Sequence, residues 1–199
     1  NCTDAFEPNA VNSKTPSPAA STKKAKVTAL KLASEPRDTD WYNDDPRYEI
    51  VENASKNLAP FFTMGSSRFL SADNKNNLWS PVNAYIELAM LAEWYGGETR
   101  QEILELLNVP DIQALREQVS AVWESIYQDD YSGVCTLANS LWLEDSIEFD
   151  DQTINNIAHH YYASVYKGDM GSQDVNNAIK NWLNKNTGGI LNANDFIIP

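Results

Sequence analysis

The stretch Asn76-Asn77-Leu78-Trp79-Ser80-Pro81-Val82-Asn83-Ala84-Tyr85-Ile86-Glu87-Leu88-Ala89-Met90-Leu91 decides how this sequence folds. Ser80 is a favourable residue just before a helix, and Pro81 suits the first helical position, where its missing N–H costs no hydrogen bond. The helix that follows is apolar on almost every side through Tyr95. A helix of this kind is expected to be buried among other elements of a folded domain.

Composition supports one folded domain that follows a tail. The 199 residues are 42% hydrophobic and include six Trp, nine Tyr and six Phe, enough for a sizeable core. Residues 1–40 carry six Lys or Arg and five Asp or Glu, a net charge of +1, whereas the remainder carries nine and 23, a net charge of −14. We therefore predict a flexible Pro/Ser/Lys-containing tail or linker at residues 1–47, in which residues 26–32 have the pattern of an added strand. The folded part is predicted at residues 48–199.

The acidity of the folded part argues against two classes of partner. Nucleic acids and anionic lipids both require a basic surface, so we expect no nucleic-acid partner. No apolar run reaches the length of a membrane span. The acidic surface is most simply a solvated one.

The two cysteines give no disulfide framework, and a bond between Cys2 and Cys135 is not expected. Cys2 is followed by a small and polar segment, which suits a lipid-modified cysteine on an exported bacterial protein. An ordinary cysteine fits that position equally well. On the first interpretation the protein is extracellular, as a secreted protein or a lipoprotein anchored at the cell surface.

Helix signals recur along the chain. A helical pattern begins at Tyr48, and Pro60 is expected to break or kink it. The pair Thr99 and Glu102 has the spacing of a capping box. Further helix starts are predicted from capping residues, and the last helix is predicted to end at a pair of glycines. These positions are Asp111, Asp150 or Asp151, Ser172, and Gly188-Gly189.

Residues 134–143 are predicted to form a single strand that is apolar on both faces, as in a sheet covered on both sides. The only other strand signal in the folded part is a short one at Val165-Tyr166. One or two strands do not complete such a sheet. We therefore expect a helix-rich α+β chain with an incomplete sheet, and we expect its exposed edges to cause self-association.

No catalytic or metal-binding pattern stands out. His159 and His160 are adjacent, so on a helix their side chains point about 100° apart and make a poor pair for one metal ion. No Gly-x-Ser-x-Gly elbow is present, and the paired aspartates fall in turns or at helix starts. We expect no metal, no cofactor and no enzymatic activity, although an enzyme whose site matches no template stays as the weakest alternative.

An ordered series of motifs runs from about residue 50 to residue 199. Its stretches are Asn76-Asn77-Leu78-Trp79-Ser80-Pro81, Gly97-Glu98-Thr99-Arg100-Gln101-Glu102-Ile103-Leu104, Thr136-Leu137-Ala138-Asn139-Ser140-Leu141-Trp142, Tyr161-Tyr162-Ala163-Ser164-Val165, Ile179-Lys180-Asn181-Trp182-Leu183 and Asn186-Thr187-Gly188-Gly189-Ile190-Leu191. Together these stretches resemble the serpin family. No single motif decides the resemblance, but their order is specific.

The resemblance implies a serpin-like fold with helices A to F and the first strands of sheet A, cut before strand 3A. It assigns a shutter region and a helix F gate, whose residues are Ser80, Pro81, Asn83, Trp182 and Thr187. The sequence departs from the family pattern at four positions. These are Pro60 in the first helix, Asn83 where serine is usual, Trp94 where a small residue is usual, and Lys180 in the last helix.

The resemblance also implies a function. Serpins inhibit serine, and sometimes cysteine, proteases by inserting a cleaved reactive loop into sheet A and trapping the acyl-enzyme. The reactive-site bond would lie after this chain, so the fragment is expected to be inactive alone. Its predicted helix at residues 111–128 is acidic, so heparin is not expected as a partner. The alternative is a non-inhibitory serpin-like binding or structural module.

Overall fold

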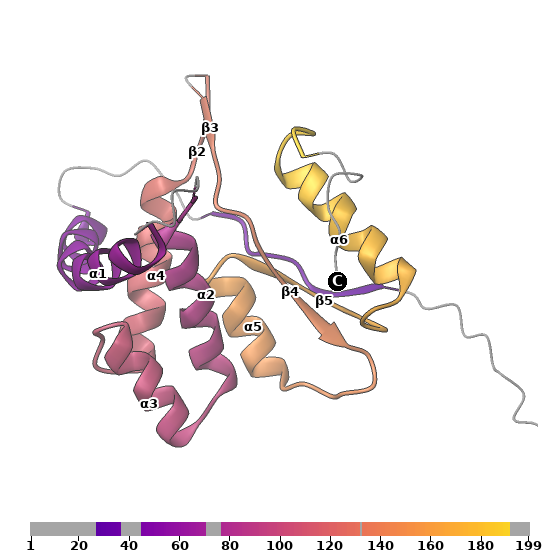
Figure 1. The fold of residues 1–199 in the computed structure, drawn as a ribbon, viewed down its shortest axis with the longest axis horizontal. Coiled ribbons are helices and arrows are strands. Elements are labelled where there is room, and N and C mark those ends of the chain that lie inside the picture. The colour runs from indigo at the N-terminus through magenta and orange to yellow at the C-terminus, as the bar shows by residue number, and fades with distance from the viewer. Residues whose placement is uncertain (1–26, 37–44, 71–76, 132, 192–199) are drawn as a thin grey trace, which may run out of the picture.

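The computed structural model describes residues 27–36, 45–70, 77–131 and 133–191. Figure 1 shows α1 to α4 gathered on one side, with α5 between them and a small sheet, and α6 across the sheet. The helices are α1 (Pro46–Leu70), α2 (Pro81–Trp94), α3 (Gly97–Leu106), α4 (Ile112–Ile126), α5 (Asp151–His160) and α6 (Gln173–Asn186). The strands are β1 (Thr28–Lys31), β2 (Gln128–Asp130), β3 (Gly133–Cys135), β4 (Asn139–Glu144) and β5 (Ala163–Gly168).

The helix α2 lies at the centre of the core, as its sequence predicts, but it is not covered on every side. Tyr85, Ile86 and Ala89 are buried against the neighbouring helices. Leu91, however, is 43% exposed and Tyr95 is 49% exposed within the described part of the chain. The prediction of an entirely buried helix is therefore corrected to a helix with one open apolar face.

The predicted caps are confirmed at three helix starts. The carboxylate of Asp111 accepts a hydrogen bond from the Ala114 N–H at 2.8 Å, and Asp150 accepts one from the Thr153 N–H at 2.7 Å. Ser172 accepts one from the Val175 N–H at 3.2 Å. Each bond satisfies an N–H that has no partner inside its helix.

Two predicted caps are wrong in their chemistry. Ser80 occupies the N-cap position of α2, with Pro81 first in the helix, but its side chain makes no capping hydrogen bond. The helix α3 begins at Gly97, so Thr99 already lies inside it and no capping box forms. Gly97 starts this helix with a φ of 58°, a left-handed conformation that a glycine adopts without steric cost.

Pro60 does not break α1, which runs without interruption from Pro46 to Leu70. Pro60 is on the exposed side of the helix, where water can bond the carbonyl that loses its N–H partner. Ala54, Leu58 and Phe61 are buried on the opposite side and keep the helix packed through the proline. Packing thus outweighs the local preference against proline.

The sheet has the order β1-β5-β4, in which β4 and β5 are parallel and β1 is antiparallel to β5. The strand suggested at residues 26–32 is thus confirmed as β1. The single strand predicted at residues 134–143 is wrong. Residues 133–135 pair with β2 in a separate hairpin. Residues 136–138 belong to no strand, and the Leu137 carbonyl there accepts a 2.7 Å hydrogen bond from the Trp123 indole.

Trp79 packs closely on α1 and gives a first testable prediction. A Cβ added at Gly65 would lie 2.6 Å from a ring carbon of Trp79, which itself stacks on Phe69. Gly65→Ala should therefore lower the free energy of unfolding by about 1 kcal/mol, since crowding of about 1–3 kcal/mol exceeds the helix-propensity gain of up to about 1 kcal/mol.

Chemical denaturation measures this effect, with Gly133→Ala as the control because nothing lies within 4 Å of its Cβ position. A more stable Gly65→Ala variant would contradict the predicted crowding.

Candidate functional site

The helix α6 lies on the side of the sheet away from α5 (Figure 1), and it holds Trp182, one of the two residues that the resemblance assigns to a gate. Side chains alternate between the two faces of β5. Val165 is buried on the core side, whereas Tyr166 stacks on Trp142 at 4.4 Å on the side of α6. Val175 is the only fully buried residue of α6. The helix is therefore held to the sheet by limited contact.

Trp182 lies between α6 and the sheet, and its role in a gate stays a prediction. It lines two cavities of about 390 and 380 Å³. The first extends past Tyr162 toward the end of α4, and the second is bounded by Trp142 and Tyr166. Trp182 is therefore not tightly enclosed between α6 and the strands.

Thr187 has a local role. Its hydroxyl donates to the Leu183 carbonyl at 2.8 Å and accepts the Leu191 N–H at 3.3 Å. Gly188 and Gly189 follow with φ values of 60° and 80° and close the helix. Trp182 thus lies within α6 and Thr187 caps its end, but only Trp182 lines the two cavities on the side of the sheet.

The proposed shutter residues lie at the start of α2, apart from α6. Ser80 and Asn83 are exposed and make no side-chain hydrogen bond among the described residues, and Pro81 is half-buried. The structure does not bring them together with Trp182. Their predicted role as a shutter stays a prediction, and Cys2 lies outside the described residues.

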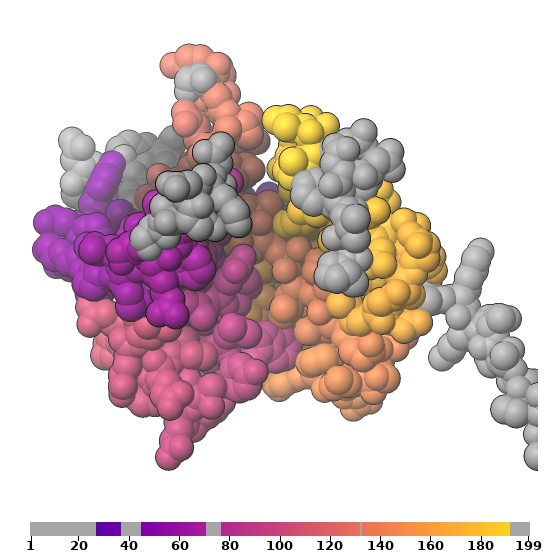
Figure 2. Space-filling view, in the orientation of Figure 1, coloured from indigo at the N-terminus to yellow at the C-terminus, as the bar shows by residue number. Residues whose placement is uncertain are grey.

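The open face of α2 forms an apolar recess with α1. This recess has a volume of about 400 Å³. Its walls include Phe61, Met64, Trp79, Leu88 and Leu91. Figure 2 shows the helical body and α6 as two masses on either side of the strands, with the β2–β3 hairpin projecting from the molecule.

Glu93 is a buried carboxylate that the sequence analysis did not assign to a site. Arg116 donates to its two oxygens at 2.6 and 2.8 Å, and the Tyr161 hydroxyl donates at 2.8 Å. Burial alone would raise the pKa of Glu93, but the hydrogen bonds from Arg116, Tyr161 and Asn156 outweigh it and hold the pKa below its usual range. This group ties α2 to α4 and to the end of α5.

Glu124 forms a second buried group on α4. Arg47 at the start of α1 lies 3.3 Å from its carboxylate, and the Tyr162 hydroxyl donates to it. Tyr162 has a φ of 48°, which costs a bulky residue about 1–2 kcal/mol. Its ring stacks on Trp123 at 3.9 Å, which helps to hold this conformation.

Tyr161 and Tyr162 therefore point to different glutamates at the turn from α5 into β5. One hydroxyl binds Glu93 on α2 and the other binds Glu124 on α4. The start of β5 is thus fixed to the helical body, in contrast to the loosely held α6.

The ion pair between Glu93 and Arg116 predicts that the stability of the fold depends on pH. The pKa of Glu93 is below its unfolded value of 4.5, so its ionised form stabilises the folded state above that pH. This contribution should be lost as the pH falls through the folded pKa. In urea unfolding, the stability difference between wild type and Glu93→Gln should therefore shrink below about pH 4.5. A difference that stays constant down to strongly acidic pH would contradict this assignment.

The described residues contain no group of three or more His, Cys, Asp or Glu side chains arranged to hold a metal ion. The rings of His159 and His160 meet edge to face at 4.8 Å, and His159 lies 3.5 Å from the Ser34 hydroxyl. No described helix is both long and apolar enough to cross a membrane.

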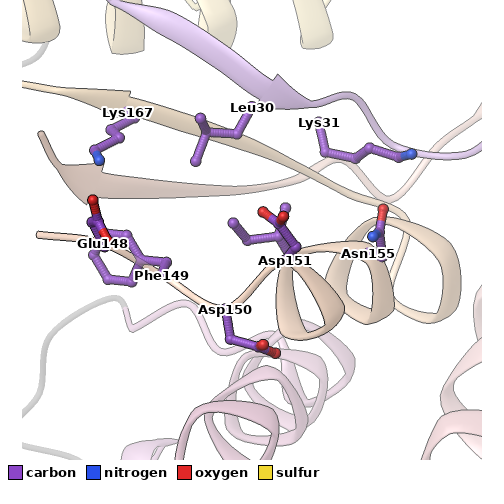
Figure 3. A pocket seen from close by; sticks show the side chains of 9 residues that line it. Leu30, Lys31, Glu148, Phe149, Asp150, Asp151, Asn155 and Lys167 are labelled. Carbon is purple, nitrogen blue, oxygen red and sulfur yellow. The ribbon is translucent and has the colours of Figure 1, made fainter.

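A recess of about 740 Å³ lies between β1 and the start of α5 (Figure 3). Lysines from the strands face carboxylates from the loop and helix across it. These residues are Lys31, Lys167, Glu148, Asp150 and Asp151. Asp150 caps α5, and the recess lining includes no Ser, Cys or His that could act as a nucleophile or base.

The arrangement of helices around a central α2, with a sheet crossed by α6, defines an α+β fold of the serpin type. Its likeness to solved serpins shows this fold. The native stressed conformation of Arabidopsis AtSerpin1 matches with a TM-score of 0.60 at 19% identity, over 76% of this chain and 39% of that one. Human glycosylated kallistatin matches with a TM-score of 0.59 at 17% identity, over 75% and 40%.

The chain belongs to the serpin family. A sequence model of that family, described as "Serpin (serine protease inhibitor)", matches residues 60–193. Among curated relatives, corticosteroid-binding globulin of Ovis aries is 25% identical over 72% of this chain and 35% of its own length. Serine protease inhibitor A6 of Xenopus laevis is 26% identical over 71% and 34%. This chain therefore spans about a third of the length of these relatives.

Proposed function

We propose that this chain is the amino-terminal part of a serpin-type inhibitor of a serine or cysteine protease. Family membership supports the proposal, as do the relatives described as serine protease inhibitor A6 and alpha-1-antiproteinase. The main observation in support is a contrast between two elements. Hydrogen bonds from Tyr161 and Tyr162 join the start of β5 to the helical body, whereas α6 buries only Val175. A sheet that admits a new strand needs both features.

The residues of this chain would serve as the base of that sheet. The buried Glu93 and Glu124 groups hold β5 to the helical body. The helix α6, with Trp182 between two cavities, would move as strands part beneath it. The reactive loop and its cleaved bond belong to the longer serpin, so this chain alone is expected to be inactive and no metal or cofactor is required.

The test uses the full-length protein encoded by the gene. Incubation with a panel of serine and cysteine proteases should give an inhibitor–protease complex that survives SDS. The chain described here, tested in parallel, should give none. Cleavage of the full-length protein by every protease without a stable complex would overturn the inhibitory proposal.

A non-inhibitory binding module is the second candidate. Two observations favour it: relatives described as corticosteroid-binding globulin, and the apolar recess of about 400 Å³ between α1 and α2. On this alternative the full-length protein would bind a small apolar ligand and be cleaved without trapping. Equilibrium binding of apolar probes to the full-length protein, together with the complex assay, separates the two candidates.

Heparin is not expected to stimulate the inhibitor. The only basic residue of α4 is Arg116, and its guanidinium is engaged by the buried Glu93. We therefore expect the rate of protease inhibition to be unchanged by heparin. A large, salt-sensitive increase in that rate would contradict this prediction.

Export, with Cys2 lipidated or unmodified, remains part of the proposal. Mass spectrometry of the amino-terminal peptide from the native organism would distinguish the two forms, since a lipid adds a defined mass to Cys2.

A further inference from the structure

The strand β1 lies ahead of the part of the chain that matches the serpin family, which begins at residue 60. It nevertheless extends the sheet. It pairs antiparallel with β5, with Thr28 opposite Lys167 and Ala29 opposite Tyr166, and the register shifts before Lys31. Residues 27–36 thus cover an edge of β5 that the family-matched part would leave open.

Backbone hydrogen bonds fasten this segment at its far end. The Ala33 N–H donates to the Ser164 hydroxyl at 3.1 Å, and the Ser34 N–H donates to the Ala158 carbonyl at 3.0 Å. These bonds add to the pairing of β1 with β5. They join residues 27–36 to both β5 and the end of α5.

The side chains of the segment are only partly packed. All four residues of β1 are exposed and Leu32 beyond them is 62% exposed, whereas Val27, Ala33, Ser34 and Pro36 are half-buried. Leu30 lines the 740 Å³ recess together with the apolar Phe149 and Ile154 and the carboxylates of Asp150 and Asp151 (Figure 3). No residue of the segment is fully buried.

The strand beneath is well fixed. Ala163 and Val165 of β5 are fully buried, and the Tyr161 and Tyr162 side chains anchor its start. A rigid strand with a free edge is a template for another strand. Residues 27–36 therefore cover a rigid acceptor without a fully buried side chain of their own.

We propose that residues 27–36 form a strap over a strand-accepting site on β5, and that release of the strap lets this site bind the strap of a second copy. The second copy is the favoured occupant because its strap has the same side chains for the same register. It also has the same N–H groups for Ser164 and Ala158. Exchange of an identical element between copies requires no new interface, since the contacts made are those already present within one chain.

Ser34→Pro tests the strap by removing the N–H that donates to Ala158. At low concentration, β5 amides should exchange hydrogen at least about tenfold faster than in wild type, as expected for a lost hydrogen bond of about 1.4 kcal/mol. At higher concentration the variant should approach its monomer–dimer equilibrium faster than wild type in sedimentation experiments sampled over time, because its strap is released more often. The final amount of dimer is not expected to rise, since the same hydrogen bond is lost within one chain and between two copies. Glu35→Pro is the matched control, because Glu35 is exposed and its N–H makes no hydrogen bond among the described residues.

Ser164→Ala is a second variant that leaves the strap sequence intact. It removes the hydroxyl that accepts the Ala33 N–H, and it should also increase hydrogen exchange at β5 and the rate of dimer formation. Two variants on opposite sides of the contact guard against a folding defect in either one.

A synthetic peptide of residues 27–36 tests the acceptor site directly. It should bind Ser34→Pro, restore protection of the β5 amides and dissociate the dimer. The same peptide with Pro in place of Ala29 should do neither, because proline cannot pair as a strand. Wild-type exchange rates in both variants, or dimers that the peptide does not dissociate, would overturn the proposal.

Discussion

Replacing Arg116 with Met should lower the free energy of unfolding by about 3–5 kcal/mol, the cost of leaving a buried charge without its partner. The Glu93 side chain is almost fully buried, and Arg116 makes both of its close ionic contacts. Urea unfolding at neutral pH measures the loss, which is large for a domain whose total stability is typically about 5–15 kcal/mol.

A second substitution shows whether the unpaired charge of Glu93 causes this loss of stability. In the double variant Glu93→Gln/Arg116→Met no charge remains, and the amide of Gln can still accept the Tyr161 hydroxyl. The double variant should therefore be more stable than Arg116→Met alone. If both variants are equally unstable, lost packing of the Arg116 side chain, rather than an unpaired charge, determines the effect.

Leu107→Ala should cost about 2–5 kcal/mol, because it leaves a cavity in the core. Leu107 is fully buried at the end of α3, and its carbonyl accepts the Tyr85 hydroxyl at 3.1 Å. The preceding residue provides a matched control, since Leu106 is 44% exposed. Leu106→Ala should change stability by less than about 1 kcal/mol. Equal losses in the two variants would contradict the placement of these leucines.

Local signals in the sequence predicted most of the helices. Asp111, Asp150 and Ser172 each cap a helix, and these caps depend on residues that are neighbours in the chain. The errors at Pro60 and Thr99 have a common cause. Both predictions relied on local preference, and the packing of α1 and the tight turn at Gly97 prevailed instead.

The strand predicted at residues 134–143 failed for a different reason. Its apolar alternation was real, but alternation does not say where pairing stops. The Leu137 carbonyl accepts a hydrogen bond from the Trp123 indole instead of pairing with a neighbouring strand, and Trp123 belongs to α4. The strand was therefore divided by a tertiary contact, which a local pattern does not show.

The buried glutamates were also missed because their partners are distant in the chain. Arg116 and Tyr161 lie 23 and 68 positions from Glu93. One signal was present in the sequence. Glu93 follows Ile86 by seven positions and Ala89 by four, so it lies on the face of α2 that both residues bury. A carboxylate at such a position requires a buried partner.

The gate and shutter roles that the family resemblance assigns both stay predictions. Trp182 lies between α6 and the sheet. Ser80 and Asn83 are exposed at the start of α2, and their surroundings in a complete serpin depend on residues beyond those described. The sequence indicates the family, but it does not indicate which side chains of the site meet.

Hydrogen exchange at β4 tests most directly the claim that this chain forms the first part of a serpin sheet. The described part of the chain pairs β4 with β5 on one side only. In this chain, alternate amides of Asn139–Glu144 that point away from β5 should exchange rapidly. In the full-length protein the same amides should be strongly protected, because another strand pairs with that edge. Equal exchange of these amides in both proteins would contradict the account.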